Sequence, residues 1–168
     1  MSDRHTNEPQ RDAGTPAITL RDVAWEDVPA LYLMQLDPDA NRMAGTKARD
    51  RAEFERVWLR NRADPTIVAR VIVRDGRVIG GISRFSADGH DHVGYWIERS
   101  EWGKGVATSA LHAFLAEIEA RPIYATVSVT NVGSIRVLER CGFVRTGTRT
   151  EPETERYIAG EVAFYRLD

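Results

Sequence analysis

The hydrophobic positions in the second half of the chain change period in a way that predicts a strand, a turn and a helix in succession. Residues 93–98 are rich in aromatic and β-branched side chains, which favours a strand. Apolar residues then recur at helical spacing from Val106 to Ile118, so one face of a helix is predicted to be buried. Gly103 and Gly105 lie between the two elements. The pattern predicts a strand that ends in a glycine turn and continues as an amphipathic helix.

The first third of the chain predicts one strand and two helices. Residues 17–21 alternate in the manner of a strand, and Asp22 is a candidate cap for a helix that ends before Pro38. The segment 37–45 has turn-forming residues throughout. A second helix is predicted near 49–62, with its apolar side chains facing inward.

The middle of the chain predicts an antiparallel meander. Strand-like runs at 66–74, 77–86 and 91–98 follow one another. Asp75-Gly76 and Asp88-Gly89 separate them, and Asp-Gly between strands is a strong hairpin signal.

The last third predicts a crossover back to this sheet. A strand at 123–129 follows the amphipathic helix and should return parallel to the third meander strand by a right-handed connection. A short helix near 133–140 is predicted to end at Gly142 in a left-handed conformation, followed by strands near 143–150 and 156–166. We therefore predict an α+β fold with a mixed, mostly antiparallel central sheet and helices on both faces.

Composition limits the organisation and the partners of the chain. Its 168 residues suit a single domain, predicted over 16–168, after a polar and disordered tail at 1–15. A net charge of −2 gives no reason to expect nucleic acid or a membrane surface as a partner. Cys141 is the only cysteine, which excludes an internal disulfide, and the N-terminal residues lack the apolar core of a signal peptide, so we expect no secretory signal. We expect a cytoplasmic protein.

The glycine turn is a candidate phosphate-binding site. Glycines allow a ligand to approach the backbone closely, and the free N–H groups at a helix start favour an anion. Thr108 stands where a Walker A motif or a Rossmann motif would need glycine, and the strand at 123–129 has no acid to bind a ribose. A nicotinamide dinucleotide is therefore not expected. Alternatively, the glycines only form a tight turn between strand and helix.

Three sequence blocks extend this interpretation. They are Gly94-Tyr95-Trp96-Ile97, then Trp102-Gly103-Lys104-Gly105-Val106-Ala107-Thr108, then Asn131-x-x-Ser134-x-x-Val137-Leu138-Glu139-x-x-Gly142-Phe143. In this order and spacing they resemble the GNAT superfamily of acyl-CoA-dependent N-acetyltransferases, most closely the Rim-type branch, which includes enzymes that acetylate the amino termini of ribosomal proteins. The resemblance covers roughly residues 80–143.

The resemblance implies where acetyl-CoA binds. The pantetheine arm would lie between the strand that ends at Glu98 and the strand at 123–129, and backbone N–H groups of the glycine turn would bind the pyrophosphate. The implied cofactor-binding residues are Ile97, Arg99, Trp102, Gly103, Lys104, Gly105, Val106, Ala107, Thr108, Asn131 and Ser134. Backbone N–H groups near Ile97 would polarise the thioester carbonyl.

The implied catalytic residues are Glu98 and Ser134. Glu98 would act as the base that deprotonates the amine through a water, and Ser134 would donate to the thiolate sulfur. Each residue has a structural alternative: Glu98 as a solvated carboxylate, Ser134 as a first-turn serine that bonds the backbone, and Asn131 as a helix cap or turn residue.

Two positions depart from the family pattern, and the histidines do not indicate a metal site. Leu138 stands where many members have a tyrosine that donates the proton, and Ser100 stands where the fuller motif has Gln or Arg. The first departure leaves the general acid unassigned. His90, His92 and His112 lack the spacing and partners of a metal site, so no metal is expected.

We expect an enzyme that transfers acetyl from acetyl-CoA to a primary amine, in a ternary complex. The acceptor would be a protein α-amino group or a small amine such as a polyamine, amino acid or aminoglycoside. Its pocket is predicted at the first two helices and the loop at 37–47. A non-catalytic acyl-CoA-binding or sensing module is the alternative, and a homodimer is kept open.

Overall fold

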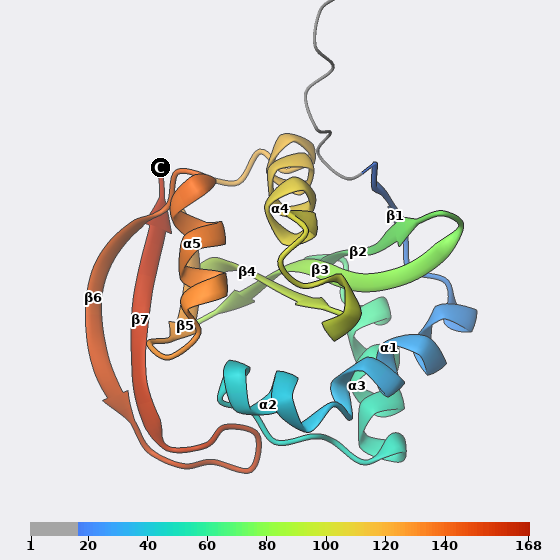
Figure 1. Cartoon of the computed structure of the whole chain (residues 1–168), viewed down its shortest axis with the longest axis horizontal. Coiled ribbons are helices and arrows are strands. Elements are labelled where there is room, and N and C mark those ends of the chain that lie inside the picture. The colour runs from blue at the N-terminus through green and yellow to red at the C-terminus, as the bar shows by residue number, and fades with distance from the viewer. Residues whose placement is uncertain (1–16) are drawn as a thin grey trace, which may run out of the picture.

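The computed structural model describes residues 17–168, and the predicted tail at 1–15 lies outside these residues. The strands are β1 (Thr19–Asp22), β2 (Val68–Arg74), β3 (Arg77–Ala87), β4 (His90–Ile97), β5 (Ile123–Ser128), β6 (Val144–Glu151) and β7 (Gly160–Leu167). The helices are α1 (Val28–Gln35), α2 (Pro38–Ala44), α3 (Arg51–Ala63), α4 (Val106–Glu117) and α5 (Val132–Arg140) (Figure 1). Short 3-10 helices, Trp25–Asp27 and Arg99–Glu101, precede α1 and the glycine turn.

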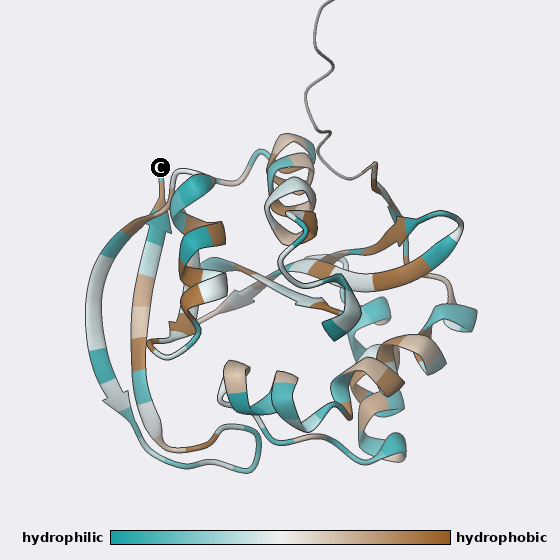
Figure 2. Ribbon diagram, viewed as in Figure 1, coloured by the Kyte–Doolittle hydropathy of each residue, from teal (hydrophilic) through white to brown (hydrophobic). Residues whose placement is uncertain are grey.

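All seven strands form one sheet in the order β1-β2-β3-β4-β5-β7-β6. Every neighbouring pair is antiparallel except β4 and β5, which are parallel and joined through α4. The predicted mixed, mostly antiparallel sheet is confirmed, as are the two Asp-Gly hairpin turns and the left-handed Gly142 after α5. Figure 2 shows the alternating hydrophobic and hydrophilic bands of α5, which reflect its amphipathic sequence.

Helices cover both faces of the sheet, as predicted. Val71 and Ile72 are adjacent on β2, fully buried, and point to opposite faces because successive strand side chains alternate. Val71 packs with Val28 and Phe54 of α1 and α3, while Ile72 belongs to the main core with α4 and α5. No helix within 17–168 is long and apolar enough to cross a membrane.

The segment 37–45 is a helix, so the prediction of a turn there was wrong. The Asp37 side chain accepts hydrogen bonds from the backbone N–H groups of Asp39 and Ala40, and Pro38 occupies the first helical position. Gly45, with φ +66°, ends the helix in the left-handed conformation. The residues that indicated a turn are the two caps of a short helix.

The predicted capping role of Asp22 was also wrong. The 3-10 helix that precedes α1 has Ala24 at its N-cap, and the backbone N–H of Ala24 donates to the Asp27 carboxylate at 2.8 Å, which also pairs with Arg21 at 2.7 Å. The Arg21 hydrogen bond holds the pKa of the Asp27 carboxyl below its usual value, against the opposing effect of burial. Asp22 instead ends β1 and pairs with Arg70.

A buried polar network anchors the connection between α2 and α3. Gln35 at the end of α1 is 4% exposed, and its amide exchanges hydrogen bonds of 2.8 and 2.9 Å with the backbone of Arg49. Asn41 donates to the Gln35 carbonyl and accepts from the Thr46 hydroxyl at 2.8 Å. Buried polar groups are costly unless paired, so these bonds fix the path of residues 45–49.

Candidate active site

The parallel strands β4 and β5 pair only at one end. Asp91 is opposite Ile123 and His92 is opposite Tyr124, and no further pair forms although both strands continue (Figure 1). Strand separation leaves backbone groups on both sides without sheet partners. We call this unpaired stretch between β4 and β5 the gap, and it lies toward the end of β4, where the family resemblance predicts the pantetheine arm.

Hydrogen-bond alternation turns the backbone of Ile97 toward this gap. The Glu98 N–H donates to the Ile79 carbonyl at 2.8 Å, so Glu98 faces β3. In an antiparallel pair the next residue faces the other way, which directs the N–H and carbonyl of Ile97 toward β5. The Trp102 indole N–H already bonds the Ile97 carbonyl at 2.9 Å, so Trp102 holds the turn while its ring remains 40% exposed.

The glycine turn presents free N–H groups. Gly103 and Gly105 have φ values of +72° and +78°, which other residues rarely adopt. The first helical bond of α4 runs from the Ser109 N–H to the Gly105 carbonyl at 3.0 Å, and no side chain caps the helix. The N–H groups of the three residues before Ser109 therefore have no acceptor within α4. This geometry fits a pyrophosphate at the positive end of the helix dipole.

A buried carboxylate next to the glycine turn forms ion pairs with three basic side chains. Glu101 is 8% exposed and pairs with Arg74 at 2.8 Å, Arg77 at 3.4 Å and Lys104 at 3.6 Å. The arginines come from the β2–β3 hairpin, so this contact depends on the sheet topology and has no signal in the local sequence. The Lys104 ammonium is thereby held beside Glu101, and its backbone N–H remains for a ligand.

Glu98, the predicted base, lies at the end of β4. Its carboxylate forms an ion pair with Arg77, and its side chain is 32% exposed. Hydrogen bonding by Glu98 raises the pKa of the Arg77 guanidinium above its ordinary value. The Arg77 guanidinium orients the carboxylate of Glu98, and it also competes with an incoming ammonium for the same oxygens. The two interpretations of Glu98, as the base and as a solvated carboxylate, both stay predictions.

Asn131 caps α5, one of the two roles predicted for it. Its Oδ1 accepts the backbone N–H of Ser134 at 3.1 Å. The half-buried Ser134 hydroxyl has no hydrogen-bond partner among residues 17–168. Because Asn131 already caps this helix, the hydroxyl of Ser134 is free for another acceptor.

Tyr95 is a residue of this region that the sequence reasoning did not single out. It reaches from β4 across to α5, where its hydroxyl donates to the Ser134 carbonyl at 3.4 Å. Leu138, at the usual tyrosine position, is 2% exposed and belongs to the main core. The phenol nearest to Ser134 thus comes from a strand, and its position in the Gly94-Tyr95-Trp96 block is the only sequence signal for it.

Burial raises the pKa of Tyr95 to about 12. The folded chain therefore keeps this proton at a pH where the unfolded chain loses it, near the ordinary value of 10.0. The resulting stabilisation is complete below that pH and disappears as the pH rises through about 12. In this window Tyr95 should make the unfolding free energy of the wild-type protein fall by at most about 1.4 kcal/mol per pH unit. We expect this fall to be absent in Tyr95→Phe. Denaturant titration below and within the window measures it, with exposed Tyr157→Phe as the control.

Helix α2 lies across the open end of the gap. At its start, Asp37 and Asp39 both pair with Arg99, which follows β4. At its end, Gly45 lies against Ser128, the last residue of β5, where an added Cβ would be 3.8 Å from the Ser128 Cβ. The side chain of Arg99 is therefore ion-paired with residues at the start of α2. Through these contacts α2 lies beside the ends of both diverging strands.

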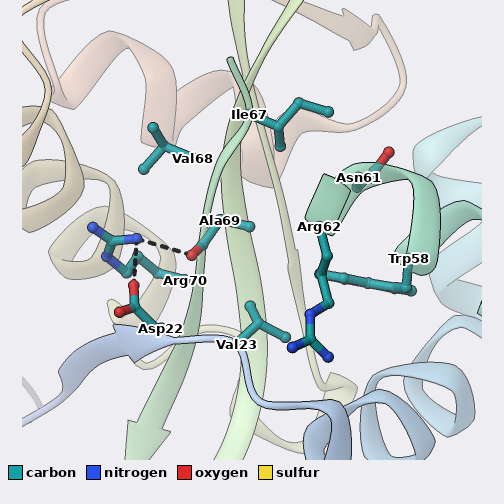
Figure 3. A pocket seen from close by; sticks show the side chains of 9 residues that line it. All are labelled: Asp22, Val23, Trp58, Asn61, Arg62, Ile67, Val68, Ala69 and Arg70. Carbon is teal, nitrogen blue, oxygen red and sulfur yellow. Dashed lines mark hydrogen bonds and ion pairs between the residues drawn. The ribbon is translucent and has the colours of Figure 1, made fainter. Parts of the chain in front are cut away.

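An open hollow of about 320 Å³ lies elsewhere, between α3 and the β1–β2 edge of the sheet (Figure 3). Its lining residues are Asp22, Val23, Trp58, Asn61, Arg62, Ile67, Val68, Ala69 and Arg70. Arg70 is engaged with Asp22 at 2.8 Å and with the Ala69 carbonyl at 3.0 Å. No predicted catalytic or cofactor-binding residue lines this hollow, but Trp58, Asn61 and Arg62 belong to the second predicted helix, one of the elements expected to form the acceptor pocket. Within 17–168, no cluster of three or more His, Cys, Asp or Glu side chains has the arrangement of a metal site.

Known proteins that are similar to this chain in sequence or in fold include proteins named as N-acetyltransferases. A Bacillus subtilis protein, YdaF, provisionally named a ribosomal N-acetyltransferase, is 31% identical over 117 residues, which are 66% of this chain and 64% of its own length. The Vibrio cholerae spermidine N-acetyltransferase in complex with CoA and spermine has a TM-score of 0.78 at 18% identity and covers 89% of this chain and 94% of its own. Mycobacterium smegmatis RimJ in complex with CoA-disulfide has a TM-score of 0.73 at 21% identity, with 91% and 82% covered. These two structures share the fold. The model of the acetyltransferase (GNAT) domain matches residues 17–144, and the chain therefore belongs to the GNAT acetyltransferase family.

Proposed function

We propose that this protein transfers an acetyl group from acetyl-CoA to a primary amine, by direct attack of the amine in a ternary complex. The observation that carries the proposal is the unpaired stretch between β4 and β5, in a chain whose next helix, α4, starts without a side-chain cap. An extended arm with amide groups suits the unpaired strand edges, and a pyrophosphate suits the helix start.

The cofactor-binding groups would be mostly backbone. The N–H groups of residues 103–108 would bind the pyrophosphate, and the strand edges at Ile97 and beyond would bond the pantetheine amides. The free N–H of Ile97 would stabilise negative charge that develops on the thioester carbonyl oxygen. Trp102 and Asn131 would act by shaping the turn and the α5 start, respectively.

Two side chains would move protons. Glu98, through a water, would accept the proton of the attacking ammonium or amine. Ser134 would donate toward the departing sulfur, together with the positive end of the α5 dipole. In this assignment Leu138 takes no part, and Tyr95 holds the backbone carbonyl of Ser134 in place.

The acceptor would bind beside α1, α3 and the segment 37–47, which contains α2. The similarity to proteins named as ribosomal and spermidine N-acetyltransferases supports an amine as the acceptor. A protein α-amino group and a small-molecule amine are the two candidate classes.

Thiol release from acetyl-CoA, measured with a panel of primary amines, tests the proposal. We expect amine-dependent release, and coenzyme A should raise the melting temperature because it binds the native state. Binding of coenzyme A without turnover of any amine would instead support an acyl-CoA-sensing module. Failure to bind coenzyme A at all would contradict both functions.

Substitutions of Ser134 and Asn131 separate catalysis from capping. We expect Ser134→Ala to lower kcat by about 10- to 100-fold, less than loss of a sole general acid, because the α5 dipole remains. Asn131→Ala removes the cap, and we expect a loss of about 1 kcal/mol, or roughly 2–4 °C in Tm. If Ser134→Ala lowers Tm and leaves turnover per folded molecule unchanged, the proton comes from water.

A further inference from the structure

Two carboxylates lie on the same side of the chain that follows β4. The Glu101 N–H donates to the Glu98 carbonyl at 2.9 Å, and the residues that follow Glu98 form the 3-10 helix Arg99–Glu101. Side chains three residues apart eclipse each other in a 3-10 turn. Both carboxylates are therefore directed toward the β2–β3 hairpin, where Arg77 forms an ion pair with each of them.

Arg77 holds these two carboxylates unequally. Its Nη1 atom forms a close ion pair with Glu98, whereas its Nη2 atom is 3.4 Å from Glu101. Within 17–168 the Glu98 carboxylate has Arg77 as its single ion-pair partner. Glu101 also pairs with Arg74 at 2.8 Å and with Lys104 at 3.6 Å. Arg77 thus bonds mainly the candidate base, while Glu101 is held mainly by other cations.

The members of this network differ in how freely they can move. Glu101 is buried, and Arg74 holds one of its oxygens. The side chains of Arg77 and Lys104 are about half exposed. Exposed side chains change rotamer within nanoseconds, whereas a packed carboxylate keeps its place. The network therefore consists of a fixed carboxylate and two cations that can exchange partners around it.

We propose that Arg77 is a positioning residue that moves from Glu98 to Glu101 when coenzyme A binds at the glycine turn, a movement that we call the Arg77 exchange. The inference rests on the proposed function, since it takes Glu98 as the base and the glycine turn as the pyrophosphate site. In the free protein Arg77 occupies a Glu98 oxygen that an acceptor ammonium, or the water that relays its proton, needs. In the coenzyme A complex this oxygen is available.

Lys104 connects the glycine turn to this network. Its contact with Glu101 is the longest of the three that Glu101 makes, and a pyrophosphate at the turn attracts the ammonium through its larger negative charge. Glu101 then lacks one of its cations, and the added negative charge beside it draws Arg77 closer. The same movement takes the guanidinium away from Glu98. Binding of coenzyme A and binding of the acceptor are therefore coupled through Arg77.

Amine binding with and without coenzyme A measures this coupling. Alaninamide and 1,4-diaminobutane represent α-amino groups and small-molecule amines, and calorimetric titration gives their dissociation constants for the free protein and for its coenzyme A complex. We expect at least one of them to bind about 5- to 20-fold more tightly to the complex, in the lower part of the range for coupled sites because Arg77 is half-exposed. Equal affinity in both states would overturn the proposal.

Two substitutions remove this difference in opposite ways. Arg77→Ala leaves Glu98 without its competitor in both states, so the amine should bind the free protein as tightly as the complex. Glu101→Gln removes the charge that draws Arg77 away, so the amine should bind the complex as weakly as the free protein. Arg77→Lys keeps the charge and should retain part of the difference. Arg136→Gln removes a positive charge from the exposed side of α5 and should leave both affinities unchanged.

A double-substitution cycle on coenzyme A affinity tests the Arg77 exchange even where no amine binds. Because the Arg77–Glu101 contact strengthens on binding, the effects of Arg77→Ala and Glu101→Gln on the dissociation constant should be non-additive by about 5-fold or more. Lys104→Ala, which leaves Glu101 without the same cation in both states, replaces Glu101→Gln in the cycle if that buried substitution unfolds the protein.

The outcomes separate the Arg77 exchange from the acetyl-transfer function. Additive effects in the cycle, or an amine affinity difference that survives Arg77→Ala, would overturn the proposal while leaving acetyl transfer intact. A non-additive cycle in a protein that releases no thiol from acetyl-CoA with any amine would instead count against acetyl transfer alone. Absence of coenzyme A binding would overturn both.

Discussion

Replacing Gly105 with valine is expected to weaken coenzyme A binding by at least about 100-fold, from the loss of two or more charge-assisted hydrogen bonds. Gly105 precedes α4 with φ +78°, and its neighbours present the N–H groups that would bind the pyrophosphate. A branched side chain disfavours this left-handed conformation and occupies the space that a phosphate needs. Calorimetric titration of coenzyme A into the folded variant measures the effect.

Gly89→Val provides a matched control for backbone strain. Gly89 lies in the β3–β4 turn with φ +75°, and an added Cβ would meet nothing within 4 Å. Both variants should lose similar stability, since the conformational penalty is the same, but only Gly105→Val should lose coenzyme A affinity. Unchanged affinity in a folded Gly105→Val protein would reject the glycine turn as the pyrophosphate site.

The sequence was sufficient where a long periodic pattern or a turn signal acted locally. The apolar spacing from Val106 to Ile118 and the two Asp-Gly turns depend on neighbours within a few residues, and the corresponding elements formed as predicted. The prediction of a turn at 37–45 was wrong, and the reason is also local. Asp37-Pro38 and Gly45 are so close in the sequence that they resemble a turn, although they begin and end a helix of 7 residues.

The charged contacts around the candidate site depend on topology, so local patterns could not reveal them. Glu101 meets Arg74 and Arg77 only because β3 returns beside β4. Arg156 donates to the Lys47 carbonyl only because the last hairpin passes the end of α2. In each case the partners are separated by more sequence than any periodicity covers. The backbone of the site was therefore easier to predict than its side-chain environment.

Glu98→Gln is expected to lower kcat by about 10²- to 10⁴-fold, the range for a lost general base, with little change in coenzyme A affinity. The amide is nearly isosteric, and its oxygen can still accept the hydrogen bond from Arg77. It cannot accept a proton from the amine at neutral pH. The increase of kcat/KM with pH should also flatten or move, which loss of an ion pair alone would not produce.

Glu119→Gln removes the same charge at the far end of α4, where the carboxylate is exposed, and should keep wild-type kinetics. The comparison isolates proton transfer from a general effect of charge on substrate attraction. A surface charge changes KM and salt dependence within about one Debye length, whereas a base changes kcat and its pH dependence. If Glu98→Gln retains the wild-type turnover and pH profile, Glu98 serves only to orient Arg77, and water takes the proton.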